Sequence, residues 1–137
     1  MAKFTLEVEE DYDFDLIGIC SHIKDYRLSW ELNNGLGFDL SKDQDFELSL
    51  KGVHQSFSFF SFIDEDNLTE YYLLSNRSET GTLIPEQNNC DYFLLIKGNS
   101  GNGEKSSLIR KISALKHVLT SFEVNVEELK SKNNLLF

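Results

Sequence analysis

The chain of 137 residues predicts an α+β fold in a single domain, residues 1–137. We expect a mainly antiparallel sheet of about five strands, with two N-terminal helices and one long C-terminal helix packed on it. Three observations predict this class. The length suits one domain. Hydrophobic residues make up 40% and aromatic residues 12%, which is enough for a packed core. Short apolar segments separated by short turns favour antiparallel pairing.

The N-terminal third predicts a strand followed by two helices. Residues 3–8 alternate apolar and polar side chains, as a half-buried strand does. Apolar residues between Phe14 and Ile23 recur at helical spacing, and Asp13 can cap such a helix. Residues 25–32 fit two patterns, because their aromatic and leucine side chains alternate while the leucines also follow an i, i+4 row. Of these alternatives, we prefer the helix.

The middle of the chain predicts strands. Residues 46–50 alternate cleanly, residues 69–75 are apolar on both faces, and residues 91–97 are apolar throughout, which is typical of a central strand. The four phenylalanines of residues 57–62 change parity halfway. Either a β-bulge keeps all four rings on one face, or this segment is buried on both faces.

The C-terminal part predicts the clearest helix, with a short helical turn after it at residues 126–130. On a helical wheel five apolar side chains share one arc. They are Leu108, Ile112, Leu115, Leu119 and Phe122.

The net charge is −10 and its distribution is uneven. Residues 1–68 hold 15 of the 23 acidic residues but 5 of the 13 basic ones. Direct nucleic-acid binding and attraction to an anionic membrane both depend on Lys and Arg, so we expect neither. A protein partner is the expectation, and an acidic field of this kind suits a basic one.

The sequence predicts a cytoplasmic protein. The N-terminal residues contain no apolar stretch of signal-peptide length, and no segment has the roughly 18 apolar residues of a membrane helix. Cys20 and Cys90 belong to no Cys-x-x-Cys pair, so we expect two reduced, buried thiols and no metal site.

Motifs for catalysis and for cofactors are weak, so we expect no cofactor. Residues 98–106 have the glycine spacing of a phosphate-binding loop, but Glu104 stands where the lysine belongs. The acidic run of residues 9–15 lacks the Ca²⁺-loop pattern and is better explained as a helix-capping run, with metal binding or a basic partner as alternatives. The histidines share no spacing that indicates a catalytic set, and no catalytic residue is predicted. They are His22, His54 and His117.

One short motif suggests a family. Ile84-Pro85-Glu86 precedes Asp91-Tyr92 and an apolar strand, with four residues between Glu86 and Asp91. This pattern resembles the IPExxxDY family of small uncharacterised bacterial proteins, whose label has three residues in that gap. The resemblance implies a small cytoplasmic bacterial protein without an assigned activity, and it supplies no catalytic residues.

The motif has a structural and a functional interpretation. Pro85 keeps Ile84 extended and can begin a helical turn, while Asp91 can accept backbone hydrogen bonds where the strand begins. The structural interpretation, a corner of the fold, is the one we prefer. In the other, Glu86, Asp91 and Tyr92 form a polar rim where a ligand or partner binds.

The sequence therefore predicts a non-enzymatic protein-binding or adaptor module. The alternative is a small-ligand-binding protein or enzyme, with a pocket lined by Phe and Tyr and rimmed by Glu86 and Asp91.

Overall fold

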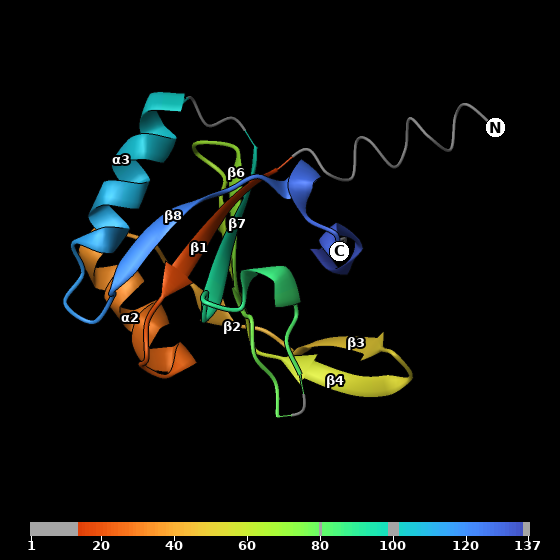
Figure 1. The fold of residues 1–137 in the computed structure, drawn as a ribbon. Coiled ribbons are helices and arrows are strands. Elements are labelled where there is room, and N and C mark those ends of the chain that lie inside the picture. The colour runs from red at the N-terminus through yellow and green to blue at the C-terminus, as the bar shows by residue number, and fades with distance from the viewer. Residues whose placement is uncertain (1–13, 80, 99–101, 136–137) are drawn as a thin grey trace.

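The computed structural model describes residues 14–79, 81–98 and 102–135. Within these residues, six strands form one antiparallel sheet in the order β2-β5-β6-β7-β1-β8, and two more form a separate hairpin, β3-β4 (Figure 1). The elements are β1 (Asp15–Cys20), α2 (Asp25–Leu36), β2 (Ser41–Lys42), β3 (Phe46–Leu50), β4 (Val53–Phe57), β5 (Phe59–Asp64), β6 (Thr69–Ser75), η1 (Pro85–Gln87), β7 (Tyr92–Gly98), α3 (Asn102–Ser113), β8 (Thr120–Val124), η2 (Val126–Glu128) and η3 (Lys132–Leu135).

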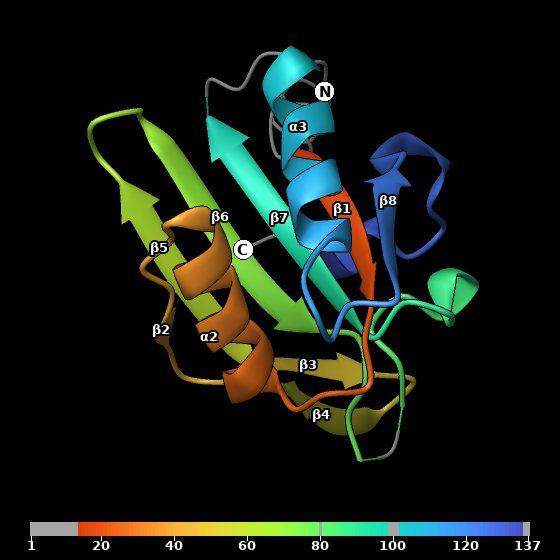
Figure 2. The ribbon, with the colours of Figure 1, turned by 90° about the vertical axis from the view of Figure 1, so that its left-hand side faces the viewer.

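The six-stranded sheet carries a packed core on each face. The two helices cover one face, which we call the helix face, and Figure 2 shows both helices lying across the strands. The hairpin, the segment around η1 and the C-terminal turns cover the other, which we call the hairpin face (Figure 1). Alternation along β1 illustrates the two cores, because Leu16 and Cys20 belong to the hairpin face while Ile17 and Ile19 belong to the helix face.

The structure is α+β, but the predicted arrangement is wrong. Instead of one sheet of about five strands, there are eight strands in two sheets, and the described chain has two α-helices rather than three. The predicted helix between Phe14 and Ile23 is strand β1, paired with β7 and β8. A strand buried on both faces is apolar at almost every position, and this pattern is hard to distinguish from a buried helix.

The predicted long C-terminal helix is also wrong, because α3 ends at Ser113 and the chain returns to the sheet as β8. The apolar arc of the helical wheel is therefore divided. Leu108 and Leu115 pack on the helix face, Phe122 packs on the hairpin face, and Leu119 is 65% exposed. After α3 the chain forms β8 instead of continuing as a helix, because β8 pairs with β1 and its β-branched residues favour a strand.

Other predictions agree with the structure. Residues 25–32 are helical, and α2 continues to Leu36, where Gly37 ends it with a left-handed backbone (φ 74°) that glycine adopts without strain. The strand predictions at 46–50, 69–75 and 91–97 correspond to β3, β6 and β7, and the turn at 126–130 contains η2. The predicted strand at 3–8 and the cap at residue 13 lie outside the described residues.

The phenylalanine-rich segment is buried on both faces. Phe57 ends β4 and Phe59 begins β5, and both pack on the hairpin face. Phe60 and Phe62 pack on the helix face. The second of the two sequence alternatives is therefore the correct one, and it places Phe59 on the hairpin face.

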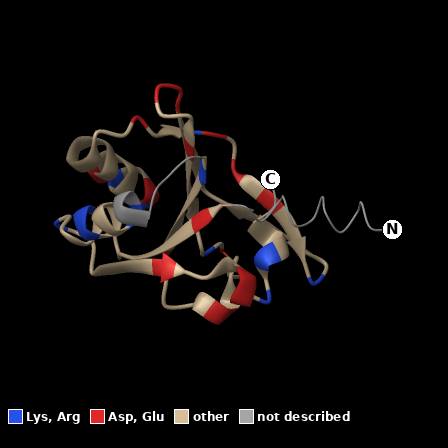
Figure 3. Ribbon diagram, turned by 90° about the horizontal axis from the view of Figure 1, so that it is seen from above, with Lys and Arg blue, Asp and Glu red and all other residues tan. Residues whose placement is uncertain are grey.

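Charge is distributed over many elements. Figure 3 shows Asp and Glu positions on strands, turns and the C-terminal turns rather than in one continuous stretch. Neither of the helices in the described residues has the length and apolar character needed to cross a membrane.

Candidate functional site

The motif residues lie in a corner of the fold, residues 83–92, which we call the motif corner. Ile84 is fully buried, and its backbone N–H donates to Asn76 Oδ1 at 2.8 Å. Pro85 occupies the first position of η1, as the sequence predicts. Glu86 accepts two hydrogen bonds from Ser131, one from the backbone N–H at 2.7 Å and one from the hydroxyl at 2.9 Å. Glu86 thereby joins the motif corner to the C-terminal turns.

Hydrogen bonding also determines the ionisation of Glu86. Partial burial raises the pKa of this carboxyl group, but hydrogen bonds from the backbone and from Ser131 lower it, and the net pKa lies below its ordinary value. The carboxylate is therefore ionised and engaged at neutral pH.

Asp91 and Tyr92 bind the motif corner to the N-terminal half of the chain. Asp91 Oδ2 accepts from the backbone N–H of Ser21 at 2.8 Å, and Oδ1 accepts from Arg77 Nε at 3.1 Å. The buried Tyr92 hydroxyl donates to the carbonyl of Ile23 at 2.7 Å. Burial is the main cause that raises the pKa of Tyr92 to about 12, so this hydroxyl keeps its proton. All of these contacts favour the structural interpretation of the motif.

The motif corner depends on Asn76, which the sequence reasoning missed. This side chain is fully buried and donates from Nδ2 to the carbonyls of Gln87 (3.0 Å) and Cys90 (2.9 Å) while accepting from Ile84. A lone asparagine after a strand carries no sequence signal for such a role, because its partners lie 8 to 14 residues further along the chain.

A groove beside the hairpin is a better candidate for binding. It has a volume of about 650 Å³ and opens to solvent. Its lining combines three aromatic rings, which we call the aromatic floor, with three carboxylates, which we call the acidic rim. We call this groove the hairpin groove. Its floor consists of Phe46, Phe59 and Tyr72, and its rim consists of Asp43, Asp45 and Glu47. Gln44 completes the lining.

The aromatic floor joins three strands from two sheets. Phe59 on β5 and Tyr72 on β6 stack, with ring centroids 5.6 Å apart and planes 20° apart. Phe46 on β3 lies 6.1 Å from Phe59 with a tilt of 32°. All three rings are only partly buried against the hairpin-face core, so the floor presents apolar surface to the groove.

The acidic rim follows the chain from β2 into β3. The backbone N–H of Asp43 donates to the carbonyl of Phe59 at 2.9 Å, which holds the rim against the floor. Asp45 contacts Lys42 Nζ at 2.6 Å, and Glu47 contacts His54 Nε2 at 2.6 Å across the hairpin. These pairs are solvent-exposed, so they contribute little to stability. The alternation of acids at 43, 45 and 47 is a signal that sequence reasoning could have used.

Negative charge extends from the rim to the floor. The Tyr72 hydroxyl hydrogen-bonds to Glu70, and Lys97 Nζ lies 5.7 Å from the centroid of the Tyr72 ring. Burial first, then the hydrogen bond and charge of Glu70 and the charge of Asp43, raise the pKa of Tyr72 to about 12. Among the described residues, three acidic residues therefore line this groove, Glu70 bonds to its tyrosine, and Lys42 and Lys97 contact its lining.

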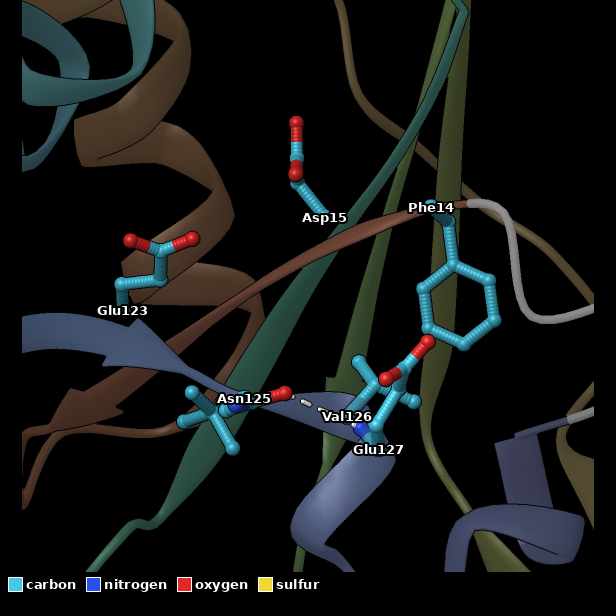
Figure 4. A pocket seen from close by; sticks show the side chains of 7 residues that line it. Phe14, Asp15, Glu123, Asn125, Val126 and Glu127 are labelled. Carbon is cyan, nitrogen blue, oxygen red and sulfur yellow. Dashed lines mark hydrogen bonds between the residues drawn. The ribbon is translucent and has the colours of Figure 1, made fainter. Parts of the chain in front are cut away.

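A second pocket, of about 440 Å³, lies where β1 begins and β8 ends. Figure 4 shows that its side chains do not converge, since the carboxylates of Asp15 and Glu123 lie on one side of the strands and Phe14 and Glu127 on the other. Lys105 already contacts Asp15 at 3.1 Å and Glu123 at 2.6 Å, and these acids, Glu123 foremost, raise its pKa. Two of the carboxylates that line this pocket are therefore already paired with a lysine of the same chain.

The remaining residues singled out in the sequence do not converge on a catalytic set. His54 pairs with Glu47, His117 contacts the buried Glu31, and His22 is exposed. Across residues 14–79, 81–98 and 102–135, no group of three or more His, Cys, Asp or Glu side chains is placed to hold a metal ion. Most of the acidic run and part of the glycine-rich loop fall outside the described residues.

Both cysteines are free and buried, as predicted. Burial is the main cause that raises the pKa of Cys20 and raises that of Cys90 to about 12. The thiols therefore remain protonated at neutral pH, which makes them poor nucleophiles.

Comparisons with known proteins add no assignment. No model of a known protein family matches the chain, and no curated protein matches it at a significant level. The resemblance to the IPExxxDY family therefore stays a prediction.

Proposed function

We propose that this protein is a non-enzymatic protein-binding module and that the hairpin groove is its binding site. The observation that carries the proposal is one open groove whose lining combines partly buried aromatic rings with acidic residues. Aromatic residues are enriched at protein interfaces because they supply much apolar contact area and lose little conformational entropy.

The partner that suits this groove is basic. Three acidic residues line the groove and Glu70 bonds to the Tyr72 hydroxyl, whereas Lys42 and Lys97 are the lysines that contact this lining among the described residues. Complementary charge increases the rate of encounter and excludes acidic competitors. The local excess of acid also agrees with the acidic N-terminal half of the sequence.

The alternative of a pocket rimmed by Glu86 and Asp91 receives less support. Ser131 occupies the Glu86 carboxylate, Ser21 and Arg77 occupy that of Asp91, and neither acid lines either of the two pockets described above. A cytoplasmic location and membership of the IPExxxDY family remain parts of the proposal, the first supported by the two free, buried thiols.

Affinity capture from the native cell tests the proposal if it compares two matched variants. Asp45→Asn with Glu47→Gln removes two charges from the acidic rim, and Asp66→Asn with Glu128→Gln removes two charges from exposed positions elsewhere. We expect proteins bound by the wild type and by the control pair to be lost from the groove pair. Equal recovery with all three baits would contradict the groove as the binding site.

A further inference from the structure

The two cysteines of the chain lie side by side, although they are far apart in the sequence. Cys20 ends β1, and Cys90 lies in the motif corner just before β7. Antiparallel pairing places Ile19 of β1 opposite Tyr92 of β7, so the end of one strand meets the beginning of the other (Figure 2). Both cysteines pack in the core of the hairpin face, and their side chains therefore lie on the same side of the sheet. We call them the thiol pair.

Three contacts place the two sulfur atoms together. Cys20 Sγ donates to the carbonyl of Asn89, the residue immediately before Cys90, at 3.1 Å. Cys90 Sγ lies against Gly18, which shares a face of β1 with Cys20, and a Cβ at Gly18 would stand 2.6 Å from this sulfur. The two thiols also hydrogen-bond to one another. The absence of a side chain at Gly18 therefore leaves the space in which the sulfurs meet.

We propose that the thiol pair is a redox-sensitive switch, which a hydroperoxide oxidises to a Cys20–Cys90 disulfide. In the first step the Cys20 sulfur attacks the hydroperoxide, the O–O bond breaks, an alcohol or water leaves, and Cys20 becomes a sulfenic acid. In the second step the Cys90 sulfur attacks that of Cys20, the S–S bond forms, the S–O bond breaks, and the Cys90 proton leaves in water. The two thiols together lose two electrons and two protons, and the hydroperoxide gains them.

Cys20 is the sulfur that reacts first. This residue is 8% exposed whereas Cys90 is fully buried, so an oxidant that arrives from solvent meets Cys20. Burial and then the charge of Asp91 raise the pKa of Cys20, while its hydrogen bond with Cys90 and the charge of Arg77 lower it, and the net pKa lies above its ordinary value. Because the thiolate is the reactive form, the pair stays reduced except under sustained exposure to oxidant.

The disulfide changes how the motif corner is held. In the reduced protein, the backbone N–H of Ser21 donates to Asp91 Oδ2 at 2.8 Å and joins this corner to the end of β1. A bond between Cys20 and Cys90 adds a covalent link at the same point and closes a loop that contains every element from α2 to η1. A disulfide that closes a long loop stabilises a fold mainly by restricting the unfolded chain. The oxidised protein should therefore resist unfolding more than the reduced one.

Oxidation of the fully reduced wild type with hydrogen peroxide tests the proposal directly. We expect the intact mass to fall by two hydrogen atoms, both free thiols to disappear, and a peptide digest to contain the Cys20 and Cys90 segments linked to each other. Size-exclusion chromatography separates this product from disulfides between molecules. The oxidised protein should melt at least about 4 °C higher, and dithiothreitol should restore both the mass and the melting temperature.

Glutathione buffers test whether the folded structure itself favours the bond. At one ratio of reduced to oxidised glutathione, we expect the ratio of disulfide to dithiol in the folded protein to be at least about tenfold that in concentrated urea. Thermodynamic linkage requires this preference to agree with the stabilisation measured by unfolding. The measurement uses the wild type throughout, so it does not depend on a variant that folds.

Two matched variants test the order of the steps. Cys90→Ser leaves Cys20 without a partner, so we expect peroxide to produce a sulfenic acid on Cys20 that dimedone traps. Cys20→Ser leaves a fully buried thiol, and dimedone should label it at least about tenfold less. Thermal unfolding confirms that each variant is folded.

Each outcome decides the inference. Two persistent thiols, products linked only between molecules, or an equal disulfide ratio in folded and unfolded protein would overturn the thiol pair as a switch. Equal dimedone labelling of the two variants would overturn the assigned order of reaction. Neither cysteine lines the hairpin groove, so failure of this inference leaves the proposed function standing.

Discussion

The motif corner and the hairpin groove both carry carboxylates, but they use them differently. The side chain of Asp91 is 18% exposed and accepts from a backbone N–H and from Arg77. The side chains of Asp45 and Glu47 are 48% and 59% exposed and contact one flexible cationic or imidazole side chain each. The corner carboxylates join distant parts of the chain, whereas the groove carboxylates face solvent and can exchange partners.

This difference shows why a conspicuous motif need not be the binding site. Pro85 begins η1 within the chain reversal between β6 and β7, and the carboxylates of Glu86 and Asp91 attach this reversal to Ser131 and Ser21. The groove residues have a weaker pattern in the sequence, yet they combine partly buried aromatic rings with exposed acidic side chains. Three predictions test this contrast.

The largest effect is expected at Asn76. Asn76→Ala removes two donors and one acceptor from buried carbonyl and N–H groups. Leaving such groups unsatisfied costs about 1–3 kcal/mol each, so we expect a loss of at least about 3 kcal/mol in the free energy of unfolding. Urea unfolding measures it. Asn67→Ala, in the exposed turn after β5, is the matched control and should cost less than about 1 kcal/mol. Similar costs at both positions would remove the distinction between corner and surface.

A smaller effect is expected at Asp91. Asp91→Asn keeps the shape of the side chain but loses the charge that attracts Arg77 and strengthens the bond from Ser21. Hydrogen bonds to charged groups are worth about 1.5–3 kcal/mol, so we expect a loss of about 1–2 kcal/mol and a clear fall in melting temperature.

Glu47→Gln is the control for Asp91→Asn, because it also neutralises one carboxylate that pairs across the chain. We expect a change below about 0.5 kcal/mol at this exposed position. An unchanged melting temperature for Asp91→Asn, together with lost function, would instead support a binding role for the motif.

The smallest effect is a pH dependence at Glu86. Its pKa is lower in the folded than in the unfolded state, so its ionised form stabilises the fold above the unfolded value near 4.5, and this contribution is lost as the pH falls through the folded pKa. Wild type should therefore exceed Glu86→Gln in stability at pH 6, and the gap should narrow as the pH falls below the unfolded value. Denaturant unfolding across this range measures the gap. A gap that persists unchanged at low pH would contradict the assigned ionisation.

Local sequence patterns correctly predicted strands that show either a regular alternation of apolar and polar residues or a continuous apolar run. Alternation located β3, and the apolar runs located β6 and β7 to within one residue at each end. The proline and acid of the motif predicted η1 and the backbone contact of Asp91. The pattern failed at β1, where burial on both faces resembles a helix, and at Leu119, which continues the helical spacing of α3 although a turn separates it from that helix.

By itself the sequence determined the α+β class, the acidic first half, the two free thiols and the corner around Pro85. These depend on composition and on contacts between near neighbours in the chain. Only the tertiary structure decided that β1 is an inner strand between β7 and β8, that Asn76 holds the corner, and that Phe46, Phe59 and Tyr72 form one floor beside the acidic rim. The physical reason is that these groups come from separate strands, and pairing between strands depends on packing of the whole sheet rather than on local preference.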